Sequence, residues 1–334
     1  MRIFRLLIVY PLLLAGVAFM VGHWWVHHPL ALSSGADEGR VEFEVPAGSS
    51  ARQVATRVSA AGLDVSPDLL WAWFRLSGEA RDIKAGYYEV DAGVTPRALL
   101  GKLVRGEQAL KSVQILEGLT ARQAIDALRA SPELTQDLEG LTIEQVMERI
   151  GLPGVHPEGR FFPDTYRVVK RAPASSVLRE AARAMQQRLD QAWAQRDPSV
   201  PLQSPEEALI LASIVEKETG RDSDRGRVAG VFTNRLRIGM RLQTDPTVIY
   251  GMGDSFDGNL RRVDLTTDTP YNTYTRAGLP PTPISLPGMA SLMAAVQPAR
   301  TDAMYFVARG DGSSQFSATL QEHNAAVRRF QLRR

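Results

Sequence analysis

Hydrophobic and polar positions follow three successive patterns along the chain, and the first of them predicts a membrane-spanning helix. Residues 6–25 form a single run without Asp, Glu, Lys or Arg. At ~1.5 Å per residue, a helix of this length crosses a hydrocarbon core of ~30 Å. Arg2 and Arg5 precede the run, and positive charge favours the cytoplasmic side of a membrane. We therefore expect a cytoplasmic N-terminus at residues 1–5 and a transmembrane anchor at residues 6–26.

A cleaved signal peptide is the alternative interpretation of this run. The apolar core of a signal peptide is typically ~7–15 residues long, whereas this run is longer and has no convincing A-x-A site directly after it. Trp24 and Trp25 also stand where an interfacial aromatic belt lies at the end of a membrane-spanning helix. Residues 27–40 are small and polar and have no apolar period, which predicts a tether to domains outside the membrane.

The second pattern, from residue 41 onward, repeats a short unit. Each unit has an extended run, a glycine turn, a Ser or Thr that can cap a helix, and a helix with apolar residues at helical spacing. Such units suggest a LysM-like glycan-binding domain, which we place at residues 41–111, but general α+β packing is consistent with the same pattern. The three extended runs are Val41–Val45, Tyr87–Val90 and Val113–Leu116.

Longer helices make up the third pattern. Residues 143–150 predict a short helix, and a long helix is expected over Val177–Gln195, opening after Ser175 and Ser176. Segments rich in Gly, Pro, Asn, Thr and Tyr connect these helices. We expect residues 112–334 to form a mixed α+β catalytic domain.

A second long helix is expected over Pro205–Thr219. Ser204 is its N-cap, Pro205 takes the first helical position, and Glu207 stands where it would complete a capping box. Gly220 marks the end of the helix.

Composition narrows the function classes. The net charge is only +2, so no strong basic field indicates a nucleic-acid partner. The chain has no cysteine, which excludes disulfides, thiolate metal sites and cysteine nucleophiles. His156 and His323 are far apart in sequence without an HExxH motif, and neither G-x-S-x-G nor a Gly-rich phosphate loop occurs. We therefore expect no metal site, no cofactor and no nucleic acid.

The helix at residues 205–219 ends with two carboxylates that the helical period places on different faces. Glu216 and Glu218 are ~200° apart around the helix axis. Glu218 continues the apolar stripe of Leu211 and Val215, whereas Glu216 falls toward the solvent side. A carboxylate on the buried face at a helix end is expected to have a raised pKa, as a general acid near neutral pH requires. The alternative is a solvated helix end with two ordinary glutamates.

This helix and the motifs around it resemble a known family. ASIVEKET at residues 212–219 is similar to the signature of the endolytic murein transglycosylase family (MltG, YceG-like), and motifs that match in order cover nearly the whole chain. Where the ending of the family often reads G-x-H-x-F, residues 312–316 contain no histidine, so we assign them no role. The other matching motifs lie at residues 83–90, 115–120, 158–166, 231–251, 271–274, 278–284, 287–295, 305–308 and 322–324.

The resemblance implies a lyase that cleaves the β-1,4 bond between MurNAc and GlcNAc inside nascent peptidoglycan strands. It implies 1,6-anhydro-MurNAc ends and the termination of strand elongation. One glutamate would protonate the leaving oxygen and then take the proton from the C6 hydroxyl, which attacks C1 in place of water. Related enzymes carry this acid in a Glu followed by a small hydroxyl residue at a helix end, which Glu218-Thr219 matches and Glu216-Lys217 does not. The helical face and the resemblance therefore agree on Glu218 as the catalytic residue.

We expect the substrate to lie in a cleft lined by polar and aromatic groups that stack on sugars and hydrogen-bond to them. Asn234 and Asn324 are candidates to bond the N-acetyl group, and Asp245 is a candidate second carboxylate. A turn or packing role is the alternative for each, because Asn, Thr and Asp favour turns. The expected substrate-binding residues are Asn234, Gln243, Thr244, Asp245, Tyr271, Asn272, Thr273, Tyr274 and Asn324.

Two other functions fit the same sequence. A muramidase that uses water would need a second carboxylate, ~5–5.5 Å from the first in a retaining enzyme, and Asp245 is the candidate. A non-catalytic peptidoglycan-binding envelope module would use the LysM-like repeats alone. The expected fold class is α+β, with a transmembrane helix, a LysM-like domain and a catalytic domain. The expected partners are peptidoglycan glycan strands, peptidoglycan synthases and the inner membrane, which the chain crosses once with its C-terminal part in the periplasm.

Overall fold

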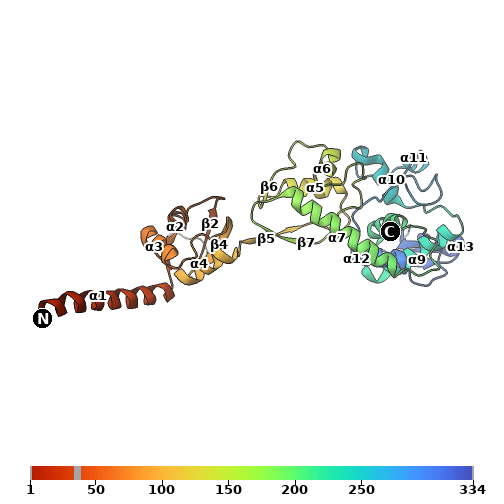
Figure 1. The fold of residues 1–334 in the computed structure, drawn as a ribbon. Coiled ribbons are helices and arrows are strands. Elements are labelled where there is room, and N and C mark those ends of the chain that lie inside the picture. The colour runs from red at the N-terminus through yellow and green to blue at the C-terminus, as the bar shows by residue number, and fades with distance from the viewer. Residues whose placement is uncertain (1, 34–38, 333–334) are drawn as a thin grey trace. The chain divides into compact units, whose positions relative to one another are not determined.

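A computed structural model describes residues 2–33 and 39–332 of the chain (Figure 1). Residues 34–38 of the expected tether and residue 1 of the expected cytoplasmic N-terminus lie outside the described residues. The chain forms two compact units, and both contain helices and strands, which confirms the mixed α+β class. The units are Met1–Lys111 with Arg167–Arg171, and Ser112–Tyr166 with Ala172–Arg334.

The first unit is built on the antiparallel strands β2 (Arg40–Val45) and β4 (Gly86–Asp91), in which Phe43 lies opposite Tyr88. Every second residue of β2 is buried, because successive side chains of a strand point to opposite faces. Three helices complete the core on the buried face of this pair. The other elements are α1 (Arg2–His27), β1 (Ala31–Leu32), α2 (Ala51–Ala60), β3 (Leu63–Asp64), α3 (Pro67–Leu76) and α4 (Pro96–Arg105).

The helices of this unit begin where the sequence predicts. Ser50 accepts the backbone N–H of Gln53 at the start of α2, and Thr95 caps α4 directly before Pro96. Gly106 takes a left-handed conformation after α4. The expected order of strand, turn, cap and helix occurs in β2–α2 and β4–α4, and again in β5 (Leu110–Gln114) and α5 (Ala121–Arg129) of the chain. A relationship to the LysM fold stays a prediction.

Helix α1 contains a segment, Val9–His27, that is long and apolar enough to cross a membrane, with a mean hydropathy of 1.5. Only 6% of the most apolar window of this segment is buried, so α1 is not a core helix of the first unit. A signal sequence near the N-terminus can pass the same test of length and hydropathy, so the anchor stays a prediction at this point.

The second unit is centred on α8 (Pro205–Glu218), which packs against α7 (Ala174–Ala194), α9 (Asp222–Arg237) and α12 (Met289–Val296). Every residue of α8 from Ala208 to Val215 is buried. A helix that is apolar on all sides belongs in the interior, and its end is carried into the interior with it. The one polar residue of this stretch, Ser213, donates its hydroxyl to the carbonyl of Ile210 and accepts the N–H of Ile284.

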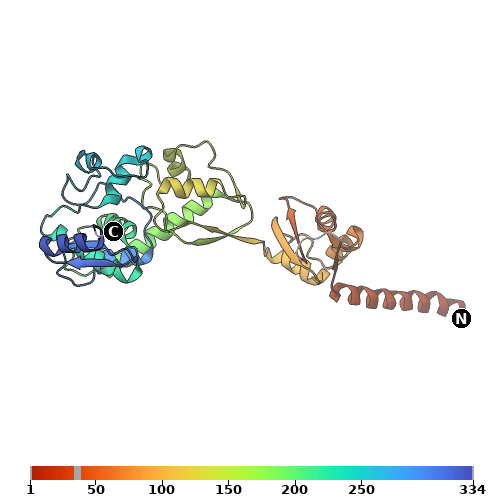
Figure 2. The same ribbon diagram turned by 180° about the vertical axis from the view of Figure 1, so that it is seen from behind.

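The remaining elements of the second unit surround this core. Figure 2 shows the last helix beside the last strand pair, and the contacts between them agree. Strands β5 and β7 (Thr165–Val169) form a two-stranded sheet. The elements are β6 (Leu134–Thr135), α6 (Ile143–Arg149), β7 (Thr165–Val169), β8 (Ala172–Pro173), α10 (Asp245–Met252), η2 (Gly253–Ser255), α11 (Arg262–Thr266), β9 (Tyr305–Ala308), β10 (Ser314–Ser317) and α13 (Leu320–Phe330).

Two details of the long helices differ from the sequence-based expectation. Helix α7 begins at Ala174, before the expected start, because the carboxylate of Asp137 accepts both the N–H and the hydroxyl of Ser175 and so satisfies the first turn. The capping box of α8 is incomplete. Ser204 does accept the N–H of Glu207, but the Glu207 carboxylate accepts the N–H of Gln203 and not that of the cap residue.

Candidate active site

The C-terminal end of α8 opens into a cleft of about 840 Å³ within the second unit. The loop before α10, the hairpin of β9 and β10, and helix α13 form its other walls. Gly220 follows Thr219, the C-cap of α8, and a Cβ at this position would lie 3.1 Å from the carbonyl oxygen of Gly312. Glycine therefore lets the chain leave α8 close to the hairpin. The polar and aromatic side chains of the lining include Glu218, Arg235, Gln243, Asp245, Tyr274, Tyr305, His323 and Asn324.

Glu218 is the carboxyl group at the centre of this arrangement. It is the last residue of α8, and its side chain lines the cleft while most of it is buried. Burial raises the pKa of Glu218, and the negative charge of Asp245 raises it further. The Thr244 hydroxyl and the Arg235 guanidinium act in the opposite direction, but burial is the largest effect. Glu218 is therefore placed to keep a proton at a pH at which an exposed glutamate has lost it.

Thr244 holds the carboxyl group of Glu218 in place. Its hydroxyl donates a hydrogen bond to Oε1 of Glu218. Thr244 is itself fixed, because its backbone N–H donates to Oγ1 of Thr273 over 3.0 Å and its carbonyl accepts the hydroxyl of Thr247. Thr273 and Thr247 are both buried. The sequence predicts Thr244 and Thr273 as sugar contacts. Both are buried, neither is among the residues that line the cleft, and together they hold the Glu218 carboxyl group.

Asp245 and Tyr274 form a second polar pair in the cleft. The phenol of Tyr274 donates a hydrogen bond of 2.5 Å to Oδ1 of Asp245. Burial and the charge of Asp245 both raise the pKa of Tyr274, so the phenol keeps its proton and remains the donor. Asp245 is also the first residue of α10, where a carboxylate is favourable at a helix N-terminus. The pair thus holds a negative charge beside Glu218.

The sequence does not predict several residues of the cleft, among them Arg235, Tyr305 and His323. Arg235 of α9 donates from Nε to the carbonyl of Met304 over 2.7 Å and from Nη1 to the carbonyl of Leu242 over 2.6 Å. Its guanidinium lies over the ring of Tyr305, and His323 stacks on the same ring at 5.2 Å between centroids. Arg235 lies in a motif that resembles the family. Its position on the inner face of α9 is the sequence feature that could have identified it as a residue of the cleft.

Two further residues that the sequence predicts as sugar contacts line the cleft, whereas Tyr271 does not. Gln243 and Asn324 line the cleft, and Gln243 has a positive φ of 50°, which turns the chain between α9 and α10. Tyr271 does not line it, because its hydroxyl bonds Oγ1 of Thr282 over 2.8 Å and its ring packs edge-on against Tyr250.

Two of the asparagines that the sequence predicts as sugar contacts hydrogen-bond to backbone carbonyls. The amide nitrogen of Asn234 donates to the carbonyls of Thr301 and Ala303, over 2.9 and 3.1 Å. The amide nitrogen of Asn272 donates to three backbone carbonyls of the segment around α11, and its oxygen accepts the N–H of Tyr274. These positions do not support a sugar contact, because the amide nitrogens are already engaged by the backbone.

Glu216 is not on a solvent face, so the expectation from the helical period is wrong in this respect. Its side chain is only 8% exposed, and Oε2 accepts the backbone N–H of Gly288 over 3.0 Å. Its other oxygen lies 4.0 Å from Nη2 of Arg225. The error arises because α12 and α9 cover the sides of α8 that a surface helix would expose. Glu216 does not line the cleft.

Glu158 is another buried carboxyl group with a strongly shifted pKa. It is buried, and Oε1 accepts the N–H of Ala121 at the start of α5 over 2.9 Å. Burial raises the pKa of Glu158 to about 7, against the opposing effect of hydrogen bonds from Ala121 and Tyr250. A pKa in this range would suit an acid catalyst. Glu158 does not line the cleft, however, so a substrate bound there would not reach it.

Comparison with known proteins shows what the chain is similar to. Residues 43–329 match the YceG-like family. The chain is 31% identical over 309 residues to a protein of Bacillus subtilis (strain 168) named endolytic murein transglycosylase, and the match covers 87% of this chain and 84% of that protein. It is 27% identical over 356 residues to a protein of the same name from Streptococcus pneumoniae serotype 2, covering 96% of this chain and 63% of that protein.

A solved structure has a similar fold. The 2.6 Å crystal structure of a yceG-like protein from Listeria monocytogenes is 29% identical in sequence to the chain and superimposes with a TM-score of 0.54. The match covers 86% of this chain and 99% of that chain.

Proposed function

The chain belongs to the YceG-like family, and on this premise we propose that it is a lytic transglycosylase that cuts peptidoglycan strands internally, with Glu218 as acid and base. One observation carries the proposal. The carboxyl group of Glu218 is buried at the end of the core helix α8, faces a polar cleft and has a raised pKa. Such a group can donate a proton to a leaving oxygen near neutral pH. The relatives named endolytic murein transglycosylases support the choice of substrate.

The proposed reaction uses the same carboxyl group twice. Protonated Glu218 donates its proton to the glycosidic oxygen between MurNAc and GlcNAc, and the bond from C1 of MurNAc to that oxygen breaks. GlcNAc leaves with a C4 hydroxyl, and positive charge develops on C1 and the ring oxygen of MurNAc. The Glu218 carboxylate then takes the proton of the MurNAc C6 hydroxyl while O6 attacks C1. The product carries a 1,6-anhydro bond, Glu218 has its proton again, and no water is consumed.

The neighbours of Glu218 suit these two steps. Because Thr244 donates to Oε1, the proton that Glu218 transfers is carried by Oε2. The negative charge of Asp245 raises the pKa of Glu218 before the first step and favours the positive charge that develops at C1 during it. Tyr274 keeps the Asp245 carboxylate in position through its 2.5 Å hydrogen bond.

A muramidase that uses water is the second candidate, and the position of Asp245 in the same cleft is the observation that favours it. In that reaction Asp245 would attack C1 or activate water, and the product would gain one water molecule. The hydrogen bond from Tyr274 makes Asp245 a weaker nucleophile, which favours the lytic reaction. A non-catalytic peptidoglycan-binding module is the third candidate.

We extend the proposal to the rest of the chain. Helix α1 anchors the protein in the inner membrane, and the second unit acts on nascent strands in the periplasm, where it ends their elongation. The first unit adds affinity for glycan, which its strand–turn–helix units support. Peptidoglycan synthases are the expected partners, because they supply the nascent strand.

Mass spectrometry of the products tests the reaction class directly. Purified full-length protein in detergent is incubated with sacculi, and the soluble glycan fragments are analysed. The proposal expects fragments that end in 1,6-anhydro-MurNAc. Fragments heavier by one water molecule would establish the muramidase reaction, and binding to sacculi without any released fragment would establish the binding module.

A further inference from the structure

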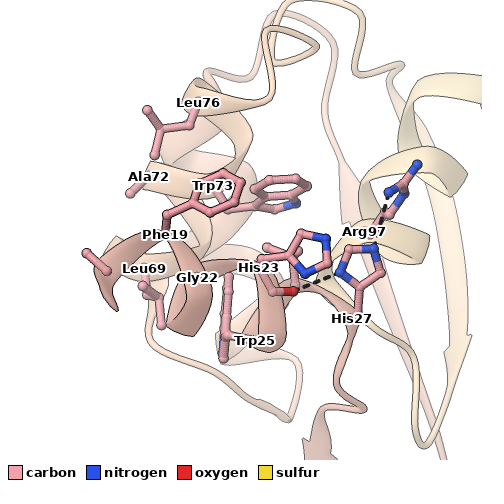
Figure 3. Close-up of a pocket in the computed structure, with 12 residues that line it drawn as sticks. Phe19, Gly22, His23, Trp25, His27, Leu69, Ala72, Trp73, Leu76 and Arg97 are labelled. Atoms are coloured by element: carbon pink, nitrogen blue, oxygen red, sulfur yellow. Dashed lines mark hydrogen bonds between the residues drawn. The ribbon is translucent and has the colours of Figure 1, made fainter. Parts of the chain in front are cut away.

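The first unit contains an apolar groove of about 480 Å³ between α1 and α3 (Figure 3). Phe19, Gly22 and Val26 line it from α1, and Trp73 and Leu76 are among its residues from α3. Polar groups gather at one end, where Arg97 bonds the ring of His27 over 3.2 Å. The groove is therefore apolar along most of its length and cationic at its rim.

Helix α3 is apolar on two faces. Leu70 and Phe74 are fully buried in the core of the first unit. A second stripe at the spacing i, i+3, i+4 and i+7 faces the groove, and its end residues Leu69 and Leu76 are 48% and 84% exposed. A surface helix of a soluble domain normally carries polar residues opposite its core face. We call this second stripe the outer face of α3; it consists of Leu69, Ala72, Trp73 and Leu76.

The position of Phe19 fixes the depth of this outer face. Phe19 lies six residues before Trp25, where the sequence predicts the interfacial aromatic belt, and this separation is ~9 Å along a helix. Phe19 and the outer face of α3 line the same groove, as Figure 3 shows for Phe19, Trp73 and Leu76. If α1 spans the bilayer, the outer face of α3 lies at the depth of the last third of that span. It then meets lipid and not water.

We propose that the outer face of α3 inserts into the membrane leaflet at the C-terminal end of α1, and that phospholipid acyl chains fill the groove. The inference rests on the membrane anchor proposed above. Arginines at the edge of the face suit the headgroup level, since Arg52 and Arg75 both lie over the ring of Trp71 while their charges stay exposed. Val26 and Leu30 are buried, so no flexible linker separates α1 from the rest of the first unit. The first unit is thereby a membrane-surface domain.

The absence of cysteine from the sequence makes a site-specific test direct. Full-length L76C and R75C variants are each labelled with a polarity-sensitive fluorophore and reconstituted in vesicles of phosphatidylcholine and phosphatidylglycerol. The two positions are adjacent in sequence but ~100° apart around α3, so R75C is the matched control. Both residues are exposed, so neither change opens the core. The inference expects several-fold stronger quenching of the label at 76 by lipids with brominated acyl chains, and stronger quenching of the label at 75 by aqueous iodide.

Flotation of the same vesicles separates failure of the anchor from failure of the inference. Protein that does not float with the vesicles overturns the anchor and the inference together. Protein that floats but has a label at 76 as open to iodide as the label at 75 overturns the inference alone. A third outcome also overturns the inference. In it, the label at 76 is protected from iodide but insensitive to brominated lipid, and it loses this protection when the protein is diluted in lipid. That result would show that a second copy of the chain covers the face.

Discussion

Replacing Glu218 by glutamine removes the group that the proposed reaction needs twice, while it preserves the size of the side chain. The glutamine carbonyl can still accept the hydroxyl of Thr244, so the cleft keeps its shape. Glutamine cannot donate the proton to the leaving oxygen or take the proton of the C6 hydroxyl. Proton transfer by a positioned group typically contributes ~10²–10⁴ in rate, so loss of both transfers should lower kcat by ~10⁴ or more.

The same change should not destabilise the protein at neutral or higher pH. Because burial raises the pKa of Glu218, the folded chain holds this proton more tightly than the unfolded chain does. The stability that this proton provides is present at low pH and is lost as the pH rises through the pKa of the folded state. Glutamine carries no charge to bury, so Glu218→Gln should melt at or above the wild-type temperature at ~pH 8, and the difference should shrink toward ~pH 5.

Glu216→Gln is the matched control on the same helix. Its carbonyl can still accept the N–H of Gly288, but the charge that faces Arg225 is lost. A hydrogen bond to a charged group is worth more than a neutral one, by about 1 kcal/mol. In a unit of roughly 200 residues, such as the second one, this loss lowers Tm by ~2–4 °C. We expect a modest loss of activity, measured as anhydro-product released from sacculi.

Three results would refute this reasoning. If Glu216→Gln is inactive and Glu218→Gln is active, the acid is assigned to the wrong residue. If both variants are active, α8 does not carry the catalytic group. If Glu218→Gln is inactive but melts well below the wild type at ~pH 8, its loss of activity reports a loss of structure.

Thr244, Asp245 and Glu158 give three further predictions. Thr244→Val removes a hydrogen bond that lowers the pKa of Glu218, so the high-pH limb of kcat should move to higher pH, with ~10-fold lower kcat from the less well held acid. Asp245→Asn removes a charge that raises this pKa, so the same limb should move to lower pH in a pH–rate profile. Glu158→Gln removes a carboxyl group with a pKa of about 7 in place of 4.5, so urea unfolding should show a gain of up to about 3 kcal/mol at ~pH 8 and less than ~1 kcal/mol at ~pH 5. An equal gain at both pH values would contradict the burial of that charge.

The sequence predicts the elements of the fold best where local chemistry decides them. Ser50, Thr95 and Ser204 accept backbone N–H groups at the helix starts that their side chains favour. The start of α7 could not be predicted, because its first turn is satisfied by Asp137, which lies far away in the chain. Local signals place an element, but a partner from a distant segment can move its end.

The lining of the cleft was less predictable than the burial of Glu218, because its walls come from separate segments. Arg235 belongs to α9 and Tyr305 and His323 to the last elements of the chain, and only folding brings them together. Asparagine gave the least reliable signal, since an amide bonds a sugar or a backbone carbonyl equally well. Asn324 lines the cleft and Asn272 holds a loop, yet both lie in motifs that resemble the family.

The different roles proposed for two carboxylates on one helix follow from their partners and not from their exposure. Residues 208–215 of α8 are buried on all sides, so the end of the helix enters the interior with both glutamates. Glu216 there meets a backbone N–H and the guanidinium of Arg225, which stabilise negative charge. Glu218 meets the hydroxyl of Thr244, the negative charge of Asp245 and the guanidinium of Arg235, but its burial is the largest effect and favours the protonated form. The helical period and the cleft therefore both favour Glu218 as the proposed acid, but the period does so for an incomplete reason: both faces are buried, and only one of them opens into a cleft beside a second carboxylate.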